Sequence, residues 1–341
     1  MNIQQETMRY RPLGNTGIEI SALSFGAGPV STLMVGDDAQ RQRAVIQTAI
    51  DCGINWFDTA ATYGGGQSER NLGCVLAELG AAERVHVATK VRLAPEELGD
   101  IRTAVRRSFE ASLERLKLPR VTLLQLHNSI TACRGDEPTS VTPADVLGPG
   151  GVAEAFEELQ SEGLVRHLGL TGIGQPEAIE QVVHSRRFAT MQTPYHLLNP
   201  SAGRPMGRPK TNGFAETDYG NIIEACAQAG MGVLAIRVLA GGALAQRPPS
   251  PHTLKTPFFP LPLYERDRLR AARLQARLGA DRPLAQEAIR FVLSHPSVSS
   301  ALIGFGEPWQ IAAALASLNC ATPPLSWDDV LAANAPYDSE E

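Results

Sequence analysis

The chain has 341 residues and a formal charge of −5 at pH 7, with 43% apolar and 20% charged residues. This composition predicts a globular protein of one large domain or two ordinary ones. Mild acidity without a block of lysine and arginine argues against nucleic acid as the main partner. Residues 1–7 lack a signal-peptide pattern and no uncharged apolar stretch of about 18 residues occurs, so we expect a cytoplasmic protein with no membrane span.

Cysteine and lysine are both used sparingly. The five cysteines are scattered without a C-x-x-C pair, which predicts reduced thiols. Lysine and arginine together number 31, but only four of these residues are lysine: Lys90, Lys117, Lys210 and Lys255. In a chain that otherwise uses arginine, a lysine at a functional position indicates a need for a compact ammonium group.

The predicted elements alternate along the chain after an opening hairpin at residues 8–21, whose turn lies at 14–17. Short apolar segments, often β-branched, predict strands that are buried on both faces. These segments are 22–28, 54–60, 85–91, 121–127, 167–172, 190–195, 232–237 and 299–304. Amphipathic stretches between them predict helices. They are 38–52, 68–79, 99–117, 152–162, 175–185, 219–229, 265–278 with 283–295, and 308–318.

Eight strands, each followed by a helix, predict an α/β fold of the (β/α)8 TIM barrel type over residues 8–330. The N-terminal β-hairpin would close the bottom of the barrel, and residues 331–341 would form an acidic tail. Three βα connections are long, and such loops belong to the C-terminal face, where barrels of this kind place their active sites. These connections are 128–151, 196–218 and 238–264. A doubly wound open sheet is the alternative, disfavoured because no G-x-G-x-x-G follows the first strand.

Polar residues stand at the ends of consecutive predicted strands. Asp58 ends the second strand, and Tyr63 follows a few residues later. Lys90 lies near the end of the third strand, and His127 ends the fourth. Taken alone, each residue also fits a structural role. Asp58 could cap a turn and Tyr63 could be a loop aromatic. Lys90 could form a structural ion pair, and His127 could be a hydrogen-bonded core histidine. In a barrel, however, these strand ends converge at one rim.

The chemistry of this set is specific. A buried ammonium stabilises a neighbouring phenolate, and a carboxylate keeps the ammonium charged. An imidazole beside them can orient a carbonyl oxygen. The four residues therefore predict a general acid–base for carbonyl and alcohol interconversion, with no thiol, activated serine or metal cage.

The sequence around these residues resembles the aldo-keto reductase superfamily. Residues 57–64 (FDTAATYG), followed by 66–69 (GQSE), are similar to that family's signature around its aspartate and tyrosine. Residues 89–90 (TK) and 126–127 (LH) match its lysine and histidine, and 11–17 (RPLGNTG) match its opening hairpin. The resemblance extends over residues 9–320.

The resemblance implies a role for each of the four residues. Tyr63 would be the proton donor or acceptor, Lys90 and Asp58 would tune it, and His127 would position the substrate oxygen. Hydride would pass directly to or from a nicotinamide cofactor, NAD(P)(H), without a metal. The chain would then be an NAD(P)-dependent oxidoreductase.

Cofactor-binding positions also follow from the resemblance, with departures. Gln192 matches the family glutamine that holds the carboxamide, whereas the usual Ser-Asn pair is Thr171-Gly172 here. The aromatic residue that stacks on the nicotinamide is absent, and we expect Arg237, or its neighbour Ile236, in its place. The expected cofactor residues are Asp58, Thr171, Gln192, Arg237, Leu239, Gly304, Phe305, Gly306 and Gln310.

The preference between NAD and NADP depends on the start of the last predicted helix. Backbone amides at a helix start suit a phosphate, and the family usually places a basic residue there for the adenosine 2′-phosphate. Residues 304–311 contain no basic residue, and Glu307 would repel a dianion. The sequence therefore favours NAD slightly, although Arg247 in the long loop after the seventh strand could supply charge.

Three stretches are similar to the aldose 1-dehydrogenase branch of the family, namely 126–129, 167–172 and 195–200. That branch oxidises sugars such as L-fucose or L-galactose to lactones with NAD, and a related branch acts on pyridoxal. We therefore expect a small carbonyl or sugar substrate. Trp56, Asn128 and Tyr195 would line its pocket with stacking and hydrogen-bonding groups, although Trp56 fits core packing equally well.

Two other functions stay open at this point. Lys90 could form a Schiff base in a lyase or aldolase on the same barrel. The chain could also be a non-catalytic, nucleotide-sensing barrel subunit, although the full set of four residues argues against lost catalysis. The sequence does not predict the oligomeric state or the direction of the reaction.

Overall fold

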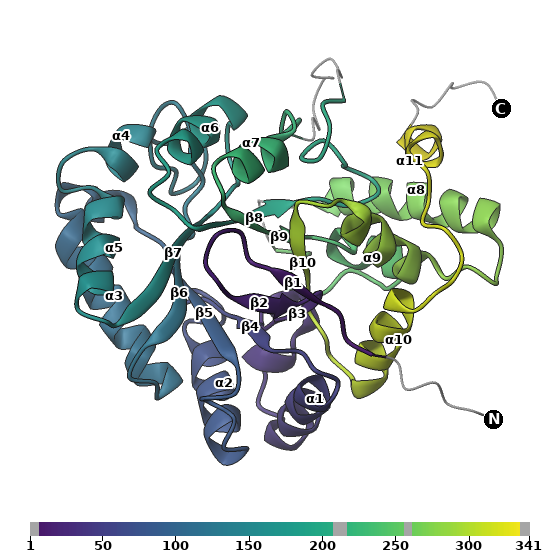
Figure 1. The fold of residues 1–341 in the computed structure, drawn as a ribbon, viewed down its shortest axis with the longest axis horizontal. Coiled ribbons are helices and arrows are strands. Elements are labelled where there is room, and N and C mark those ends of the chain that lie inside the picture. The colour runs from purple at the N-terminus through teal and green to yellow at the C-terminus, as the bar shows by residue number, and fades with distance from the viewer. Residues whose placement is uncertain (1–6, 207–216, 256–260, 335–341) are drawn as a thin grey trace.

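The computed structural model describes residues 7–206, 217–255 and 261–334, and its centre is a closed parallel barrel of eight strands (Figure 1). The order around the barrel is β10-β3-β4-β5-β6-β7-β8-β9, so strands adjacent in sequence are neighbours in space. The predicted (β/α)8 fold is confirmed. The barrel strands are β3 (Leu23–Gly26), β4 (Trp56–Asp58), β5 (His86–Val91), β6 (Val121–Leu126), β7 (Val165–Thr171), β8 (Thr190–Pro194), β9 (Gly232–Ile236) and β10 (Val298–Ile303).

Several of these strands are shorter than their predicted apolar segments. Residues 27 and 59–60 are buried just beyond the C-terminal ends of β3 and β4, and the amides of Ala27 and Thr59 still donate to Asp58 and Ala88 of the neighbouring strands at 2.8 and 2.9 Å. The predicted segments therefore include residues that continue the contact between strands but fall outside the strands themselves. This matters for function, because the residues beyond the ladder form the rim that carries the site.

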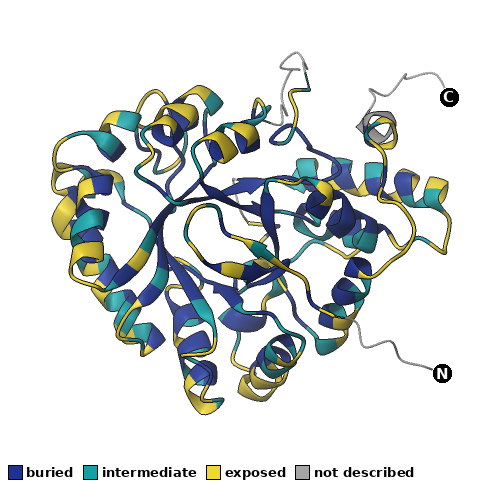
Figure 2. Cartoon of the chain, viewed as in Figure 1, coloured by how far each residue is buried: buried dark blue, intermediate teal, exposed yellow. Residues whose placement is uncertain are grey.

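Helices surround the barrel, and their inner faces are buried while their outer faces are exposed (Figure 2). They are α1 (Ala39–Asp51), α2 (Gln67–Glu78), α3 (Ile101–Leu116), α4 (Pro143–Leu147), α5 (Val152–Ser161), α6 (Pro176–His184), α7 (Ile222–Gln228), α8 (Leu261–Leu278), α9 (Leu284–Ser294), α10 (Pro308–Leu318) and α11 (Trp327–Asn334). In the described part of the chain, the connections also contain four 3-10 helices: η1 (Pro29–Ser31), η2 (Leu33–Val35), η3 (Pro95–Gly99) and η4 (Ala240–Ala245).

The N-terminal hairpin closes the bottom of the barrel, as predicted. It consists of β1 (Tyr10–Pro12) and β2 (Glu19–Ser21), which pair antiparallel. Its apolar side chains form a separate buried cluster with inward-facing residues of the barrel strands. The members are Leu13, Ile18, Ile20, Trp56, Ala88, Leu123 and Leu234. The lower barrel is therefore filled with apolar side chains, and the polar residues are left for the layer above.

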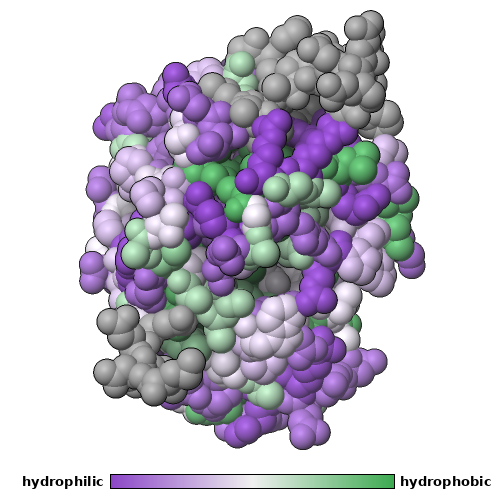
Figure 3. Space-filling model, turned by 90° about the vertical axis from the view of Figure 1, so that its right-hand side faces the viewer, coloured by the Kyte–Doolittle hydropathy of each residue, from purple (hydrophilic) through white to green (hydrophobic). Residues whose placement is uncertain are grey.

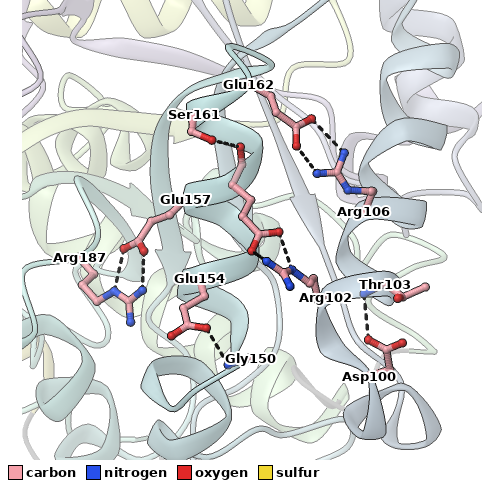
Figure 4. A network of polar contacts seen from close by, with 11 residues as sticks. Asp100, Arg102, Thr103, Arg106, Gly150, Glu154, Glu157, Ser161, Glu162 and Arg187 are labelled. Carbon is pink, nitrogen blue, oxygen red and sulfur yellow. Dashed lines mark hydrogen bonds and ion pairs between the residues drawn. The ribbon is translucent and has the colours of Figure 1, made fainter.

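Ion pairs join neighbouring helices on the outside of the barrel (Figure 4). Arg102 and Arg106 on α3 pair with Glu158 on α5 and with Glu162 directly after it. Arg187, which follows α6, pairs with Glu157 of α5. Exposed pairs of this kind contribute about 0–1 kcal/mol each, so the apolar core rather than this network stabilises the fold.

The C-terminal part differs in detail from the predicted elements. Helix α8 begins at Leu261 instead of residue 265, and α11 extends to Asn334, past the residue where the acidic tail was expected to begin. The side of the molecule that carries α8, α10 and α11 is mainly hydrophilic, with smaller hydrophobic groups between the polar ones (Figure 3). Across the three described stretches of chain, none of the helices combines the length and apolarity needed to traverse a membrane.

Candidate active site

The four predicted acid–base residues meet at the C-terminal rim of neighbouring strands. Asp58 is the last residue of β4, and Lys90 lies one residue before the end of β5. His127 directly follows β6, and Tyr63 lies in the turn between β4 and α2. Parallel strands in ladder order bring these ends together, since β4 pairs with β5 and β5 with β6. The sequence prediction that they converge matches this geometry.

Lys90 and Asp58 form a buried ion pair inside the barrel. The Lys90 Nζ donates to Asp58 Oδ1, and also to the Thr59 carbonyl oxygen at 2.8 Å. Both side chains are almost fully buried, with 1% and 2% exposed. The other carboxylate oxygen, Oδ2, accepts hydrogen bonds from Gln125 Nε2 at 3.0 Å and Gln192 Nε2 at 2.5 Å. The charge of Asp58 is therefore balanced on both of its oxygens.

The ammonium group of Lys90 is also directed at Tyr63. Its third donor contact is the Tyr63 hydroxyl at 3.5 Å, and Nζ lies 5.0 Å from the centre of the tyrosine ring. Burial alone would lower the pKa of Lys90, but the Asp58 carboxylate and the Tyr63 oxygen offset this and raise it. Lys90 thus stays protonated and can stabilise negative charge on the phenol oxygen.

A run of glycines fixes the turn that carries Tyr63. Gly64, Gly65 and Gly66 all have a positive φ, between 58° and 85°, a backbone conformation that residues other than glycine rarely adopt. A Cβ on Gly64 would also lie 3.0 Å from the Val35 side chain. The turn returns the chain directly into α2, and its Tyr63 carbonyl accepts from the Ser68 amide at 3.3 Å. The backbone therefore holds Tyr63 over the end of the barrel.

His127 is adjacent to Tyr63 and is uncharged. The two rings meet edge to face, with 5.5 Å between their centres. Its Nδ1 shares a hydrogen bond with the Thr62 hydroxyl at 3.3 Å. Burial, and then the nearby charges of Lys90 and Arg92, hold the pKa of His127 well below its usual value. At neutral pH the imidazole can thus offer one N–H to a substrate oxygen without carrying a charge.

Neutral buried histidines make the fold sensitive to acid. Burial lowers the pKa of His196 to about 3, helped by three arginines, Arg237, Arg270 and Arg266. The unfolded chain protonates its histidines near pH 6.5, whereas the folded chain does not, so stability is complete above that pH and is lost as pH falls. We expect the free energy of unfolding to decrease by about 1.4 kcal/mol per pH unit for each such histidine between pH 6 and 4.

Urea unfolding at pH 7, 6, 5 and 4 measures this slope. His196→Gln should make the slope shallower, while His184→Gln on the exposed part of α6 should leave it unchanged. An equally steep loss of stability in the His196→Gln variant would contradict the assignment.

A cavity of about 1030 Å³ opens above these residues. Asp58, Tyr63 and His127 line one part of it, whereas Lys90 lies beneath and does not reach it. All nine expected cofactor residues line the cavity: Asp58, Thr171, Gln192, Arg237, Leu239, Gly304, Phe305, Gly306 and Gln310. Both Ile236 and Arg237 face it, so the position next to the nicotinamide stays a prediction for these two residues.

The cavity has polar groups that suit a dinucleotide. The Thr171 hydroxyl is buried and has no hydrogen-bond partner among the described residues, which indicates a group that a ligand would satisfy. At the start of α10, the amides of Gly306 and Glu307 donate to Gln310 Oε1 at 2.7 and 3.1 Å. These two amides are therefore engaged by Gln310, and the Thr171 hydroxyl is the donor of this set that stays available to a ligand.

Sequence reasoning missed several cavity residues. Arg41 of α1 donates from Nε to the Gly306 carbonyl at 2.9 Å and pairs with Glu307 at 2.6 Å. No sequence signal links two segments that lie so far apart in the chain. Arg247, which was considered for its charge, stacks on the exposed ring of Trp309, with its guanidinium 5.1 Å from the ring centre.

The three residues expected at a substrate wall do not line the cavity, which corrects that prediction. Trp56 faces into the barrel but lies one layer too low, in the cluster with the hairpin. Asn128 is buried, and its side chain bonds the Leu93 amide and carbonyl at 2.9 and 2.8 Å, which ties two loops together. Tyr195 packs on Phe291 with 5.2 Å between ring centres. The residues that do line the cavity include Val30, Thr62, Arg92, Ser129 and Ile173.

Comparisons with known proteins give a family match over most of the chain. A family model described as "Aldo/keto reductase family" matches residues 22–334. L-galactose dehydrogenase from Arabidopsis thaliana is 36% identical over 170 residues, which is 49% of each chain, so the match spans about half of that relative. D-threo-aldose 1-dehydrogenase from a Pseudomonas species is 29% identical over 321 residues, 86% of this chain and 88% of the other.

A solved structure is similar over nearly the whole length. The aldo-keto reductase AKR11C1 from Bacillus halodurans, in its holo form, has a TM-score of 0.70 and 23% identity. The match covers 97% of this chain and 99% of that one. At this level of identity the likeness demonstrates the fold.

Proposed function

Because the chain belongs to the aldo/keto reductase family, we propose that it is an NAD(P)-dependent oxidoreductase that interconverts an alcohol or sugar hemiacetal with a carbonyl or lactone. The observation that carries the proposal is the arrangement of Tyr63, Lys90, Asp58 and His127 at one end of the cavity. The expected cofactor residues line the same cavity, so a reacting carbon could sit between the two sets.

The chain's own residues supply binding and proton transfer. In the reduction, Tyr63 gives its hydroxyl proton to the carbonyl oxygen, and Lys90 stabilises the phenolate that results. In the oxidation, the phenolate removes the proton from the alcohol. The neutral His127 directs the substrate oxygen toward Tyr63. The nicotinamide, when bound, supplies or accepts the hydride, and Thr171 and Gln192 would hold its carboxamide.

A sugar or another small polar carbonyl compound is the proposed substrate class. Two relatives carry the names of sugar dehydrogenases. The cavity lining includes the polar side chains of Thr62, Arg92 and Ser129 and the apolar side chains of Val30 and Ile173. Such a mixture suits a molecule that has both hydroxyl groups and a hydrophobic edge.

Schiff-base chemistry on Lys90 is not favoured. Its Nζ is committed to Asp58, Thr59 and Tyr63, and it does not reach the cavity. The carboxylate also keeps it protonated, whereas a nucleophilic amine must lose its proton. Borohydride added with substrate should therefore trap no adduct.

A spectrophotometric screen tests the proposed function. Sugars, aldehydes and pyridoxal are offered with NAD, NADP and their reduced forms, and the absorbance of reduced nicotinamide is followed. Turnover of at least one sugar or aldehyde is expected. Tight cofactor binding without turnover across the whole panel would instead support the non-catalytic, nucleotide-sensing subunit.

Cofactor preference depends on Glu307 at the start of α10. We propose that NAD binds more tightly than NADP, because the Glu307 carboxylate repels a 2′-phosphate even though Arg41 pairs with it. In Glu307→Gln the Arg41 guanidinium loses its negatively charged partner, and we expect the Kd for NADP to fall about 10-fold, while the Kd for NAD changes little. Quenching of protein fluorescence, to which the exposed Trp309 at the cavity contributes, measures both constants without turnover.

Glu78→Gln is the matched control, because it changes the same charge at the far end of α2. It should leave both dissociation constants unchanged. A wild-type protein that already prefers NADP, or a Glu307→Gln variant with no gain in NADP affinity, would refute this preference.

A further inference from the structure

We propose that Gln125, which is not one of the four acid–base residues, is a positioning residue that holds the Asp58 carboxylate in place against Lys90. This proposal rests on the proposed function, because it assigns Gln125 to the same acid–base group. Gln125 lies on β6, two residues before His127, and is fully buried. It does not line the cavity, so it acts only through Asp58.

The hydrogen bond to Asp58 fixes the direction of the Gln125 amide. Its Nε2 donates to Asp58 Oδ2 at 3.0 Å, on the opposite oxygen from Lys90. The reversed amide would place its oxygen against the carboxylate, and the two would repel each other. Gln125 is therefore a donor to a buried negative charge, a type of bond stronger than one between neutral groups.

The other end of the same amide is left unsatisfied. Gln125 Oε1 is buried without a hydrogen-bond partner among the described residues. Such an oxygen costs stability, and a leucine at this position would avoid the cost. Gly169 on the neighbouring strand lies close to this side chain, since a Cβ there would lie 2.3 Å from Thr190 Oγ1 and 3.1 Å from Gln125 Cγ. With its nitrogen paired and its oxygen unpaired, Gln125 serves as a donor rather than as a packing residue.

The amide of Gln192 also donates to Asp58, but unlike the Gln125 amide it can be reached by a ligand. Gln192 Nε2 donates to the same Asp58 oxygen at 2.5 Å, but Gln192 lines the cavity. A ligand amide in the cavity can draw Gln192 away from Asp58. Gln125 cannot be reached by that ligand and keeps the oxygen satisfied. We therefore infer that Gln192 binds the ligand, whereas Gln125 keeps its hydrogen bond to Asp58.

Removing the donor should change the acid–base chemistry and spare cofactor binding. In Gln125→Leu, the Asp58 carboxylate holds the Lys90 proton more tightly, so the ammonium stabilises the Tyr63 phenolate less. We expect the pH profile of kcat for alcohol oxidation to move about half a unit to higher pH, which lowers kcat at pH 7 by about 3-fold. The Kd for NAD, from fluorescence quenching, should change by less than about 2-fold.

A measurement that needs no turnover accompanies the kinetics. Tyrosinate absorbance is titrated in the protein without added cofactor, and the same titration of Tyr63→Phe is subtracted to isolate Tyr63. The difference signal of Gln125→Leu should appear at higher pH than that of the wild type. Circular dichroism and thermal unfolding establish that each variant is folded.

Gln125→Glu provides the conservative comparison. Its carboxyl group has nearly the shape of the amide, and it can donate to Asp58 only while protonated. The ratio of its kcat for carbonyl reduction to the wild-type value should therefore rise as pH falls from 8 to 5. The same ratio for Gln125→Leu should show no such rise. If the leucine variant does not fold, Gln125→Glu still tests the proposal, because a ratio that does not change with pH would overturn it.

Two further variants separate positioning from general disturbance. Thr193→Val removes a buried hydroxyl of β8 that has no hydrogen-bond partner in the described residues, and it should leave the pH profile in place. Gln192→Leu should weaken cofactor binding more than Gln125→Leu does. An unshifted profile in folded Gln125→Leu, or a loss of cofactor affinity equal to that of Gln192→Leu, would overturn the proposal. Full turnover in Tyr63→Phe would instead refute the proposed function itself.

Discussion

Replacing Tyr63 with phenylalanine should lower kcat by about 10²- to 10⁴-fold, while the Kd for the cofactor stays nearly unchanged. The hydroxyl is the group proposed to exchange a proton with the substrate oxygen, and phenylalanine lacks only that atom. The ring contacts remain available, because His127 meets the ring edge to face and Lys90 lies over it. Steady-state kinetics in both directions and fluorescence titration with NAD and NADP measure the two effects.

The control for this variant is another tyrosine hydroxyl far from the cavity. Tyr10 of β1 is exposed, and its hydroxyl donates to the Gly53 carbonyl at 2.9 Å. Tyr10→Phe should retain wild-type kcat. Turnover of Tyr63→Phe within a few-fold of the wild type would mean that another group carries the proton.

Lys90→Met should abolish most turnover and also destabilise the fold by roughly 3–5 kcal/mol. The substitution leaves the Asp58 carboxylate buried without its cation, and the two glutamine amides cannot replace a full positive charge. The loss of stability therefore has a cause separate from the loss of catalysis. Urea unfolding at pH 7 measures the first and steady-state kinetics the second.

The double variant Asp58→Asn with Lys90→Met separates these causes. It removes both charges, so much of the lost stability should return while turnover stays low. Recovery of activity in the double variant would contradict the catalytic role of the pair. An unaltered free energy of unfolding in Lys90→Met would contradict the buried ion pair.

Lys90→Arg belongs to the same series. The planar guanidinium is larger than the ammonium and does not fit three acceptors arranged around one nitrogen. We expect it to be poorly tolerated, whereas Lys117→Arg and Lys255→Arg, at exposed positions, should be mild. Lys210, for which the same mild effect is predicted, lies outside the described residues.

The acid–base residues could be predicted from sequence because strand order and barrel closure bring consecutive strand ends together. Asp58, Lys90 and His127 needed only this rule. The height of a side chain along the barrel axis is harder to predict from sequence. Trp56 and Asp58 point to the same side of β4 but lie in different layers. Strand periodicity gives the side on which a residue lies and not its height.

Other parts of the site had weaker signals. Gln125 lies between leucines in β6, after Leu124 and before Leu126, and a polar residue inside such an apolar run is a signal that a buried partner exists. Arg41 gave none, because its contact with Gly306 joins α1 to the start of α10 across most of the chain. Long-range side-chain pairs of this kind depend on how helices pack around the barrel, which local patterns do not encode.

The burial of Lys90 has a practical consequence for chemical labelling. Amine-reactive reagents need a deprotonated, accessible amine, and Lys90 has neither property. Among the lysines that the structure describes, Lys117 and Lys255 are exposed, and Lys255 borders the cavity. Attachment of the protein to a surface through Lys117 would leave the cavity open, whereas attachment through Lys255 would place the linker at its entrance.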